Sequence, residues 1–544
     1  MPVKWNPYIK DGAESWNKAF EKIGFKDVIC VKEFPKNDTL FNANSFDCMT
    51  IRYSASWLNS AQTTIHSDTR TGEILNASIL INANMISVQY ADRIGATVAI
   101  DPRVRTTVFP QEIQGELIQA AIAQAVGTGL GLTMNWGASC AYPVDSLRSA
   151  SFTQKYGLAS SVMGGVIIND VATEEDVRNG VCLVNTKPGP YDELVIKYLY
   201  QPIYASSLQE EKETLDSWIR EHTGDPYYAY IRNQSRFDSD PRNSRGSLGD
   251  DHLKSFDYML PNVRKGFENY YSWFAKEDRD FLMRRRVHSA LSERLSGRIY
   301  AILSYIGGIY LNDIREKDAI PSYSMVDREK QKAALSKALE LAKNLDWVDD
   351  TAHLNEFEIS DKKADRLRLD IFNGIFGRLP YVEVCTERFP DAAYTASEYL
   401  DDIYGIVWEG VLKHRPLENF DRALQTAFLE SIISTSTATA PIGSFKASKT
   451  GFAATGKPEI NLAALRNGGK VDMKMHSLQN AEEVAGFSSI PPIYTNQTKI
   501  AAYYFDLLMR TKDMLKKAIS TAPEADRSHY DLLIYRINKA TEIE

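Results

Sequence analysis

Histidine and cysteine are the side chains of this chain best suited to bind a metal ion, and it has eight of the first and five of the second. A zinc site on a helix needs two histidines one turn apart, but the closest two, His222 and His252, are 30 residues apart. The closest cysteines, Cys30 and Cys48, are 18 residues apart, so a C-x-x-C motif for zinc or redox chemistry is absent. The sequence therefore predicts no local metal motif and no disulfide framework.

Two glycine-rich stretches have spacings close to those of phosphate-binding loops. Residues 451–457 read GFAATGK, but Pro458 stands where a P-loop has the Ser or Thr that binds magnesium. Gly127, Gly129 and Gly131 follow a predicted helix, whereas the glycines of a dinucleotide-binding turn follow a strand. We interpret both stretches as loops or helix ends without phosphate chemistry.

The most specific motifs lie between Asp101 and Met163. This stretch reads DPRVRT and then, from within a predicted helix, AVGTGLGLTMNWGASCAYPVDSLRSASFTQKYG, followed by SSVMGG. It resembles the EcxA-like zinc-dependent metalloproteases of the metzincin clan, large proteins of which many come from gut Bacteroidota. In that family the helix carries H-E-x-G-H-x-L-G-L-x-H-N, and a later turn, the Met-turn, reads S-I-M-D-Y. Looser similarity extends over nearly the whole chain.

When the chain is aligned with this motif, each zinc ligand and the catalytic glutamate of the family are replaced by another residue. The three zinc histidines fall at Gln124, Thr128 and Met134, and the catalytic glutamate falls at Ala125. A metzincin needs three imidazoles to hold zinc and a glutamate to take a proton from the zinc-bound water. An amide, a hydroxyl and a thioether are poor zinc ligands, and a methyl group transfers no proton. The resemblance therefore implies a degenerate site with no metal and no catalytic residue, in a protein that we expect not to be an enzyme, although zinc is the cofactor of the family.

The positions that shape the scaffold of the family are kept. Gly131 allows the chain to leave the helix sharply, Asn135 follows the third ligand position, and Met163 would form an apolar floor. Gly164 and Gly165 replace the Asp-Tyr of the Met-turn. The resemblance thus implies that the fold persists although its chemistry does not.

A scaffold that is kept while its zinc-binding and catalytic residues are replaced predicts a pseudopeptidase, which binds a peptide without cleaving it. In metzincins an extended peptide pairs with the edge strand of the sheet, which needs no metal. By resemblance we expect this edge strand at residues 74–82 and the opposite wall near residues 163–166. The candidate residues that line this cleft are Ile74, Ala77, Ile79, Ile81, Gly164 and Gly165.

Two other functions stay open. The protein could be a hydrolase that uses a different site in its helical half, where the acidic pairs Asp250-Asp251 and Asp349-Asp350 lie. Such pairs are more often helix caps or solvated turns. It could also be a purely structural assembly domain whose helical surface binds a partner chain.

The helices and strands expected around these residues indicate an α+β fold. A metzincin-like domain over residues 1–205 would contain a mixed twisted sheet, with strands at 27–31, 48–54 and 74–82, and the helix that carries the motif at 111–126. Long helical patterns follow in a helical domain at residues 206–433, one of them nearly continuous over 263–311. We expect residues 434–544 to form a loop rich in Ser, Thr, Ala and Gly and then closing helices.

Composition narrows the choice of partners. The chain of 544 residues has a net charge of −8 and no long basic run, so nucleic acid is not expected as a partner. No apolar stretch reaches 18 residues, so we expect no membrane span. By resemblance alone we expect an exported protein of the periplasm, or a lipoprotein of the outer membrane or cell surface. Its expected partners are a peptide or protein ligand and an outer-membrane or protease partner. The N-terminus has no apolar signal core, and we expect a targeting segment to precede it.

Overall fold

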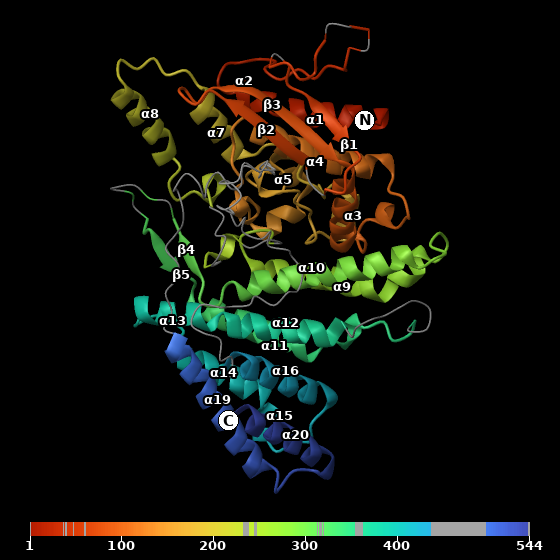
Figure 1. Ribbon diagram of the computed structural model, residues 1–544, viewed down its shortest axis with the longest axis vertical. Helices are drawn as coiled ribbons and strands as arrows, with labels where there is room; N and C mark the ends of the chain where they lie inside the picture. The colour runs from red at the N-terminus through yellow and green to blue at the C-terminus, as the bar shows by residue number, and fades with distance from the viewer. Residues whose placement is uncertain are drawn as a thin grey trace, which may run out of the picture.

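The computed structural model shows helices stacked in layers below a small sheet (Figure 1). It describes residues 2–541 apart from several gaps. These are residues 36, 39–40, 47, 59–60, 232–238, 244–246, 313, 315–317, 319, 354–362 and 437–496. The P-loop-like stretch 451–457 and most of the segment 434–456 lie outside the described residues. The expected α+β class is confirmed.

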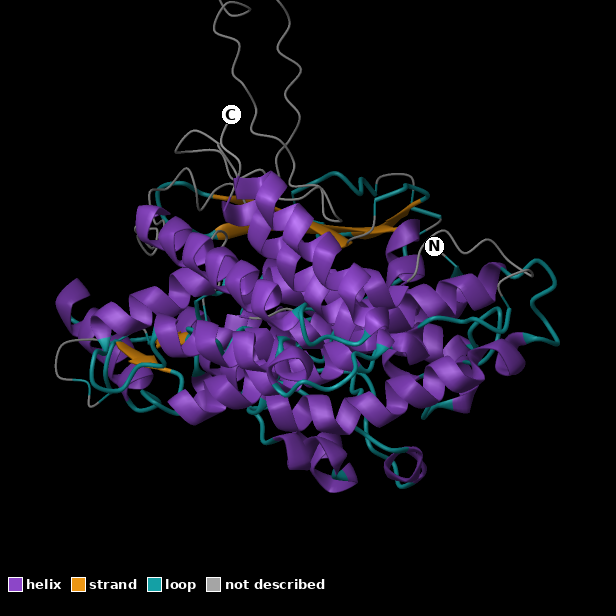
Figure 2. Ribbon diagram, turned by 90° about the horizontal axis from the view of Figure 1, so that it is seen from below, coloured by secondary structure: helices purple, strands orange, loops and turns teal. Residues whose placement is uncertain are grey.

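One mixed three-stranded sheet forms the upper layer. Its strands are β1 (Ile51–Ser54), β2 (Ala61–Ser67) and β3 (Ile74–Asn82), in the order β1-β3-β2. β1 runs parallel to β3 and β2 runs antiparallel to it. Along β2 the side chains alternate between half-buried and exposed, which is the pattern of a strand with one face on the core. In Figure 2 these strands lie along one border of the molecule, with the helices on one side of them.

The helix that carries the motif packs on the inner face of this sheet. It is α4 (Gln111–Gly129), and Pro110 precedes its first turn. Apolar side chains of α4 pack against β3 and against the N-terminal helix, which is why α4 is buried on most of its surface. The other helices of this part are α1 (Asn6–Glu14), α2 (Asn17–Glu21), α3 (Ala83–Thr97), α5 (Ala150–Tyr156), α6 (Glu174–Arg178), α7 (Pro190–Tyr200) and α8 (Leu208–Arg220).

Two long helices join the upper part to the helical half. They are α9 (His252–Phe274) and α10 (Leu282–Leu303), and α10 packs against α3. The buried carboxylate of Asp170 pairs with both Arg294 and Arg298 of α10. The largest cluster of buried side chains contains residues from both sides of position 205, including Leu117 and Leu291.

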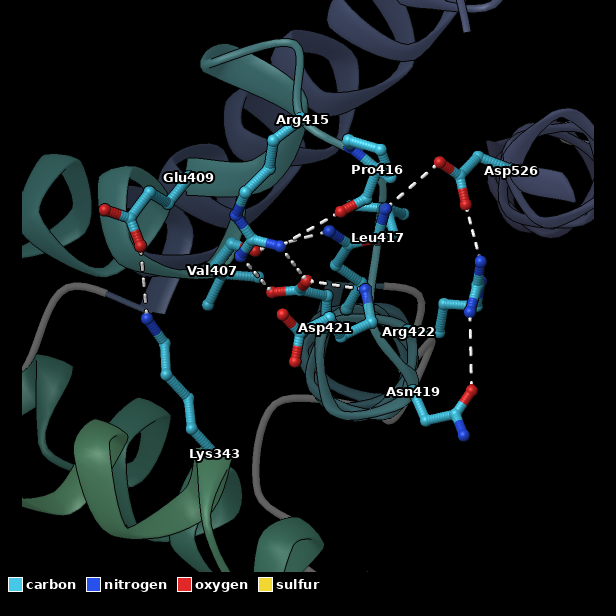
Figure 3. A network of polar contacts seen from close by, with 12 residues as sticks. Lys343, Val407, Glu409, Arg415, Pro416, Leu417, Asn419, Asp421, Arg422 and Asp526 are labelled. Carbon is cyan, nitrogen blue, oxygen red and sulfur yellow. Dashed lines mark hydrogen bonds and ion pairs between the residues drawn. The ribbon is translucent and has the colours of Figure 1, made fainter. Parts of the chain in front are cut away.

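The lower layers are helical apart from a short hairpin, β4 (Ile309–Leu311) with β5 (Tyr323–Met325). Arg422 of α16 pairs with the buried Asp526 of the last helix at 2.6 Å, and Arg415 pairs with Asp421 at 2.7 Å (Figure 3). Further along this network, Lys343 pairs with Glu409. The pairs Arg422–Asp526 and Lys343–Glu409 join segments that are distant in sequence. The helices here are α11 (Arg328–Lys343), α12 (Lys363–Gly377), α13 (Leu379–Arg388), α14 (Ala396–Val407), α15 (Glu409–Leu412), α16 (Asn419–Ser436), α19 (Gln497–Ala518) and α20 (Glu524–Thr541).

Some sequence-based expectations about elements are confirmed and others are wrong. The strand expected at 74–82 forms over those residues, whereas the strand expected at 27–31 is absent. There the side chain of Asn17 satisfies both main-chain groups of Ile29, so no partner strand is needed. The continuous helix expected over 263–311 is instead α9 and α10, with Phe281 at a φ of 60° before α10 begins. No helix among the described residues is both long and apolar enough to cross a membrane.

Candidate functional site

The motif positions on α4 lie one helical turn apart near its C-terminal end. Gln124 and Thr128 are half-buried, and the Thr128 hydroxyl donates to the Gln124 carbonyl oxygen at 3.3 Å. Ala125, which the resemblance places at the position of the catalytic glutamate, is buried. Its carbonyl oxygen accepts the hydroxyl of Thr63 from β2 at 2.9 Å. These positions therefore lie where α4 meets strand β2.

Gly131 reverses the chain after α4, as the sequence predicts. The amide of Leu132 donates to the Gly127 carbonyl at 3.0 Å and the amide of Gly131 donates to that of Thr128 at 2.9 Å. This pair of bonds is the Schellman end of a helix, which requires a left-handed residue, and Gly131 has a φ of 91°. The reversal brings Met134 back to the helix, where its Sδ accepts a hydrogen bond from Gln124 Nε2 at 3.2 Å. The structure thus brings the first and third motif positions together.

Asn135, expected as a structural residue, is fully buried and connects three segments. Its main-chain amide donates to the Met163 carbonyl at 3.1 Å. Its side chain donates to the carbonyl of Ala229 at 2.9 Å and accepts from the amide of Ile231 at 3.1 Å. No pattern in the sequence indicated that residues 229–231 would lie beside the motif.

Met163 lies beneath α4 and is fully buried. A Cβ added at Gly127 would lie 2.6 Å from Met163 Sδ and 2.5 Å from Cζ2 of Trp16. Trp16 in turn donates its indole N–H to the Ala123 carbonyl at 2.8 Å. Gly127 is therefore required by this close approach, a role that its place in a glycine-rich stretch did not reveal.

The turn formed by residues 161–165 is held by Asp192, a residue that no sequence pattern singled out. One carboxyl oxygen lies 2.5 Å from the hydroxyl of Ser161, and the other accepts the amides of Val162 and Gly189, each at 2.9 Å. Asp192 is fully buried. Burial raises the pKa of this carboxyl to about 7.

The expectation that residues 74–82 form the edge strand is wrong. β3 is the central strand, and β2 is the edge strand next to α4. The physical reason is that β1 pairs with the other side of β3, through register pairs such as Ile51 with Ile79. Ala77, Ile79 and Ile81 are accordingly buried side chains of the core rather than lining residues.

The hydrogen bonds of β3 show which groups of β2 face outward. The amide of Ile79 donates to the Thr50 carbonyl at 2.8 Å, so the main-chain groups of Ile79 point toward β1. Thr63 lies opposite Ile79 and Ile65 lies opposite Ala77, so both are in non-hydrogen-bonded pairs and point their N–H and C=O groups away from β3. No main-chain hydrogen bond joins either residue to another described part of the chain. Strand β2 therefore presents an unpaired edge.

The remaining candidate residues differ in their surroundings. Ile74 is half-buried, and its Cδ1 would lie 3.5 Å from a Cβ at Gly131. Gly164 packs near Ile167, whereas Gly165 has a φ of 94° and open space where a side chain would be. Ile74 and Gly165 thus remain accessible at the two sides of the motif.

The donor atoms at the motif positions do not suit zinc. They are an amide oxygen, a hydroxyl and a thioether, whereas zinc in proteins is bound by imidazole, thiolate or carboxylate. The thioether of Met134 already accepts a hydrogen bond from Gln124. Within the described part of the chain, no three His, Cys, Asp or Glu side chains cluster closely enough to hold a metal ion.

The acidic pairs of the helical half are used in structural hydrogen bonds. Asp250 accepts the Val144 amide at 3.1 Å, and Asp251 caps α9. Asp350 accepts from His353 Nδ1 at 2.9 Å and from the Tyr270 hydroxyl. These last three residues line a pocket of about 220 Å³ between α9 and the segment after Trp347, away from the motif.

Comparison with known proteins places this site within a described family. The family model that matches residues 106–415 is described as Met-zincin. The match covers more than half of the chain, from just before α4 to just after α15. No curated protein and no solved structure matches the chain.

Proposed function

The chain belongs to the Met-zincin family, and we propose that it is a pseudopeptidase, a member that binds an extended peptide or protein segment without cleaving it. The observation that carries this proposal is the set of side chains at the motif positions. Gln124, Thr128 and Met134 offer no ligand that zinc prefers, and Ala125 offers no base. Within the family, the resemblance to EcxA-like proteases identifies these four positions as a degenerate zinc motif.

The retained frame supports binding. We interpret the 161–165 turn as the Met-turn of the family, because Met163 lies beneath α4 and contacts the segment after the third motif position through Asn135. The Schellman end at Gly131 keeps the sharp exit of the chain from the helix. A frame that holds its shape through packing and hydrogen bonds can present a binding surface without a metal ion.

Strand β2 is the surface to which we assign the ligand. Its outward N–H and C=O groups at Thr63 and Ile65 are unpaired among the described residues, and an extended peptide can add to such an edge as a further strand. Thr63 also donates to the carbonyl of Ala125 and thereby ties this edge to α4. Main-chain pairing gives affinity with little dependence on sequence, so we expect side-chain selectivity to come from residues near the motif, such as Met134.

A pair of variants at one residue tests strand pairing. Ile65→Pro removes an outward N–H without breaking a bond to β3, whereas Ile65→Ala removes the side chain and keeps the N–H. With a library of labelled extended decapeptides as the probe, we expect Ile65→Pro to weaken binding by about tenfold more than Ile65→Ala, as the loss of one hydrogen bond implies. Equal weakening in both variants would exclude pairing through this edge, and no binding by the natural chain would overturn the proposal.

Zinc and peptide cleavage are tested separately. After dialysis against zinc and then buffer, we expect far less than one equivalent of zinc on the natural chain. We also expect no cleavage of the same peptides after long incubation. One bound zinc that is lost in a Met134→Ala variant would show that the motif positions do form a metal site.

A second candidate function, hydrolysis at another site, has one observation in its favour. Asp350 orients His353 through Nδ1, as the acid of a catalytic triad orients its histidine. Among the described residues, however, no Ser, Thr or Cys is hydrogen-bonded to His353. Hydrolysis of an ester substrate that is abolished by His353→Gln would favour this candidate. A chain that binds no peptide but co-purifies with a partner would favour the structural alternative.

Location and partners follow from the resemblance alone. We propose an exported protein of the cell envelope that acts beside an outer-membrane or protease partner, because EcxA-like relatives are exported. Fractionation of the native host tests this location, and recovery of the chain in the cytoplasm would contradict it.

A further inference from the structure

The carboxyl group of Asp192 is the anchor of the 161–165 turn. Asp192 lies in the first turn of α7, and its Oδ2 accepts two main-chain amides, those of Val162 and Gly189, each at 2.9 Å. Its Oδ1 lies 2.5 Å from the Ser161 hydroxyl, whose oxygen accepts the amide of Met163 at 2.9 Å. One carboxyl group therefore fixes three consecutive residues of the turn, directly or through Ser161.

The division of partners between the two oxygens suits a carboxylate that accepts from Ser161, and it also suits a neutral carboxylic acid. In that form Oδ2 is the carbonyl oxygen, which accepts both amides, and Oδ1 carries the proton. That proton can be donated to the oxygen of Ser161, because a hydroxyl both donates and accepts. When Asp192 is ionised, Ser161 must donate instead, and a full negative charge is then buried.

Among the described residues, no cation pairs with Asp192 to compensate that charge. The titratable groups that act on Asp192 are Glu193 beside it on α7 and the phenol of Tyr142, and both disfavour further negative charge. Lys22, from the end of α2, pairs with Glu193 rather than with Asp192. The 161–165 turn itself contributes no charged side chain. Burial is the largest effect and raises the pKa of Asp192 to about 7, because it outweighs the hydrogen bonds from Ser161, Gly189 and Val162, which lower it.

We propose that Asp192 anchors the 161–165 turn as a neutral acid, and that its ionisation weakens this anchor, so that the turn is a pH-sensitive element beneath α4. The sign follows from linkage. A group whose pKa is raised by folding stabilises the closed turn fully below its ordinary pKa near 4, and this contribution is lost progressively as the pH rises to about 7. Above that pH no further loss is expected.

The turn reaches the motif through two contacts. Met163 accepts the amide of Asn135, directly after Met134, and the Met163 side chain lies against Gly127 of α4. Opening of the turn therefore releases the floor beneath the motif positions. This inference concerns the turn itself and does not depend on a ligand.

Hydrogen exchange of the full chain, followed by mass spectrometry, tests the proposal. Peptides that cover residues 158–166 and 186–194 report on the amides of Val162, Met163 and Gly189. After correction for intrinsic rates, we expect their exchange to accelerate by about tenfold per pH unit between pH 5 and 7 and to level off above it. Peptides from α10 serve as the internal reference and are expected to show no such slope. Exchange of the turn that is independent of pH in the natural chain would overturn the proposal.

Asp192→Asn is the informative variant, because an asparagine side chain imitates the neutral acid. Its oxygen can accept both amides and its NH₂ group can donate to Ser161. We expect the pH dependence of the exchange rate to vanish in Asp192→Asn, so that the amides of the turn are protected as well at pH 8 as at pH 5. A purely structural carboxylate would instead lose protection equally at every pH.

A second pair of variants keeps the test decisive if Asp192→Asn does not fold. Ser161→Ala removes the acceptor of the acid proton and should reduce the pH slope, whereas Ser161→Thr keeps the hydroxyl and should preserve it. The same slope in Ser161→Ala and Ser161→Thr would overturn the assigned proton position.

Discussion

Gln124 donates a hydrogen bond to the thioether of Met134 at 3.2 Å, across the turn that ends α4. By resemblance, the two residues fall at the first and third positions of the family motif, and they lie together although neither is a histidine. Gly131, with its φ of 91°, provides the reversal that makes this contact possible. The packing and hydrogen bonds of this region therefore hold these two residues together.

This relationship predicts that the zinc site can be restored. In the variant Q124H/A125E/T128H/M134H, three imidazoles and a carboxylate would occupy the positions that the frame already brings together. We expect about one equivalent of zinc to remain after dialysis, measured by metal analysis. A control variant that keeps Gln124 lacks one ligand and is expected to hold zinc at least tenfold more weakly. A folded quadruple variant without zinc would show that residue 134 cannot direct a ligand toward α4.

Local patterns in the sequence predicted the elements that are rich in apolar residues. Strand β3 and helix α4 are examples, because apolar residues recur along the whole of each. Strand β2 was missed because its residues, AQTTIHS, are mostly polar and are stabilised by pairing with β3. The edge strand was assigned to residues 74–82 by resemblance, and this was wrong because the order of strands in a sheet is a non-local property.

Some residues of the candidate site could likewise be located from the sequence, and others could not. The resemblance located Gly131, Asn135 and Met163, which lie within one stretch of sequence. It did not locate Asp192, whose partners Ser161 and Val162 are about thirty residues away. Hydrogen bonds between distant segments leave no periodic signal, so only the structure reveals them.

Gly127→Ala tests the close approach beneath the motif. The new methyl group would lie 2.6 Å from Met163 Sδ and 2.5 Å from Cζ2 of Trp16. Despite the better helix propensity of Ala, we expect a loss of about 1–3 kcal/mol in the free energy of unfolding, measured by urea denaturation. Gly297→Ala in α10 meets nothing within 4 Å and should be neutral or stabilising by up to about 1 kcal/mol. Equal effects of the two substitutions would contradict the packing described for Met163.

The buried ion pairs of Asp170 predict a large cost for removing one partner. Burial disfavours the charge of Asp170, but Arg294 and Arg298 outweigh it and lower the pKa of this carboxyl. Asp170→Ala leaves the buried guanidinium of Arg298 without its partner. We expect a loss of about 3–5 kcal/mol in the free energy of unfolding. Replacement of Asp68, in an exposed pair with Arg70, is the control and should leave the unfolding midpoint unchanged within error.

His252 predicts a loss of stability in acid. Burial lowers the pKa of this imidazole to about 4, and the ring is held between the Pro241 carbonyl, 3.0 Å from Nε2, and the ring of Tyr305. Because the unfolded chain binds the proton at a higher pH than the folded one, stability falls as the pH is lowered from about 6.5 to about 4. The loss is on the order of 3 kcal/mol by the size of the shift. The variant His252→Gln keeps an N–H for the Pro241 carbonyl. In this variant the slope of the free energy of unfolding against pH, measured by urea denaturation across this range, should be smaller by about one proton. An unchanged slope in that variant would mean that the acid sensitivity of the chain arises at other groups.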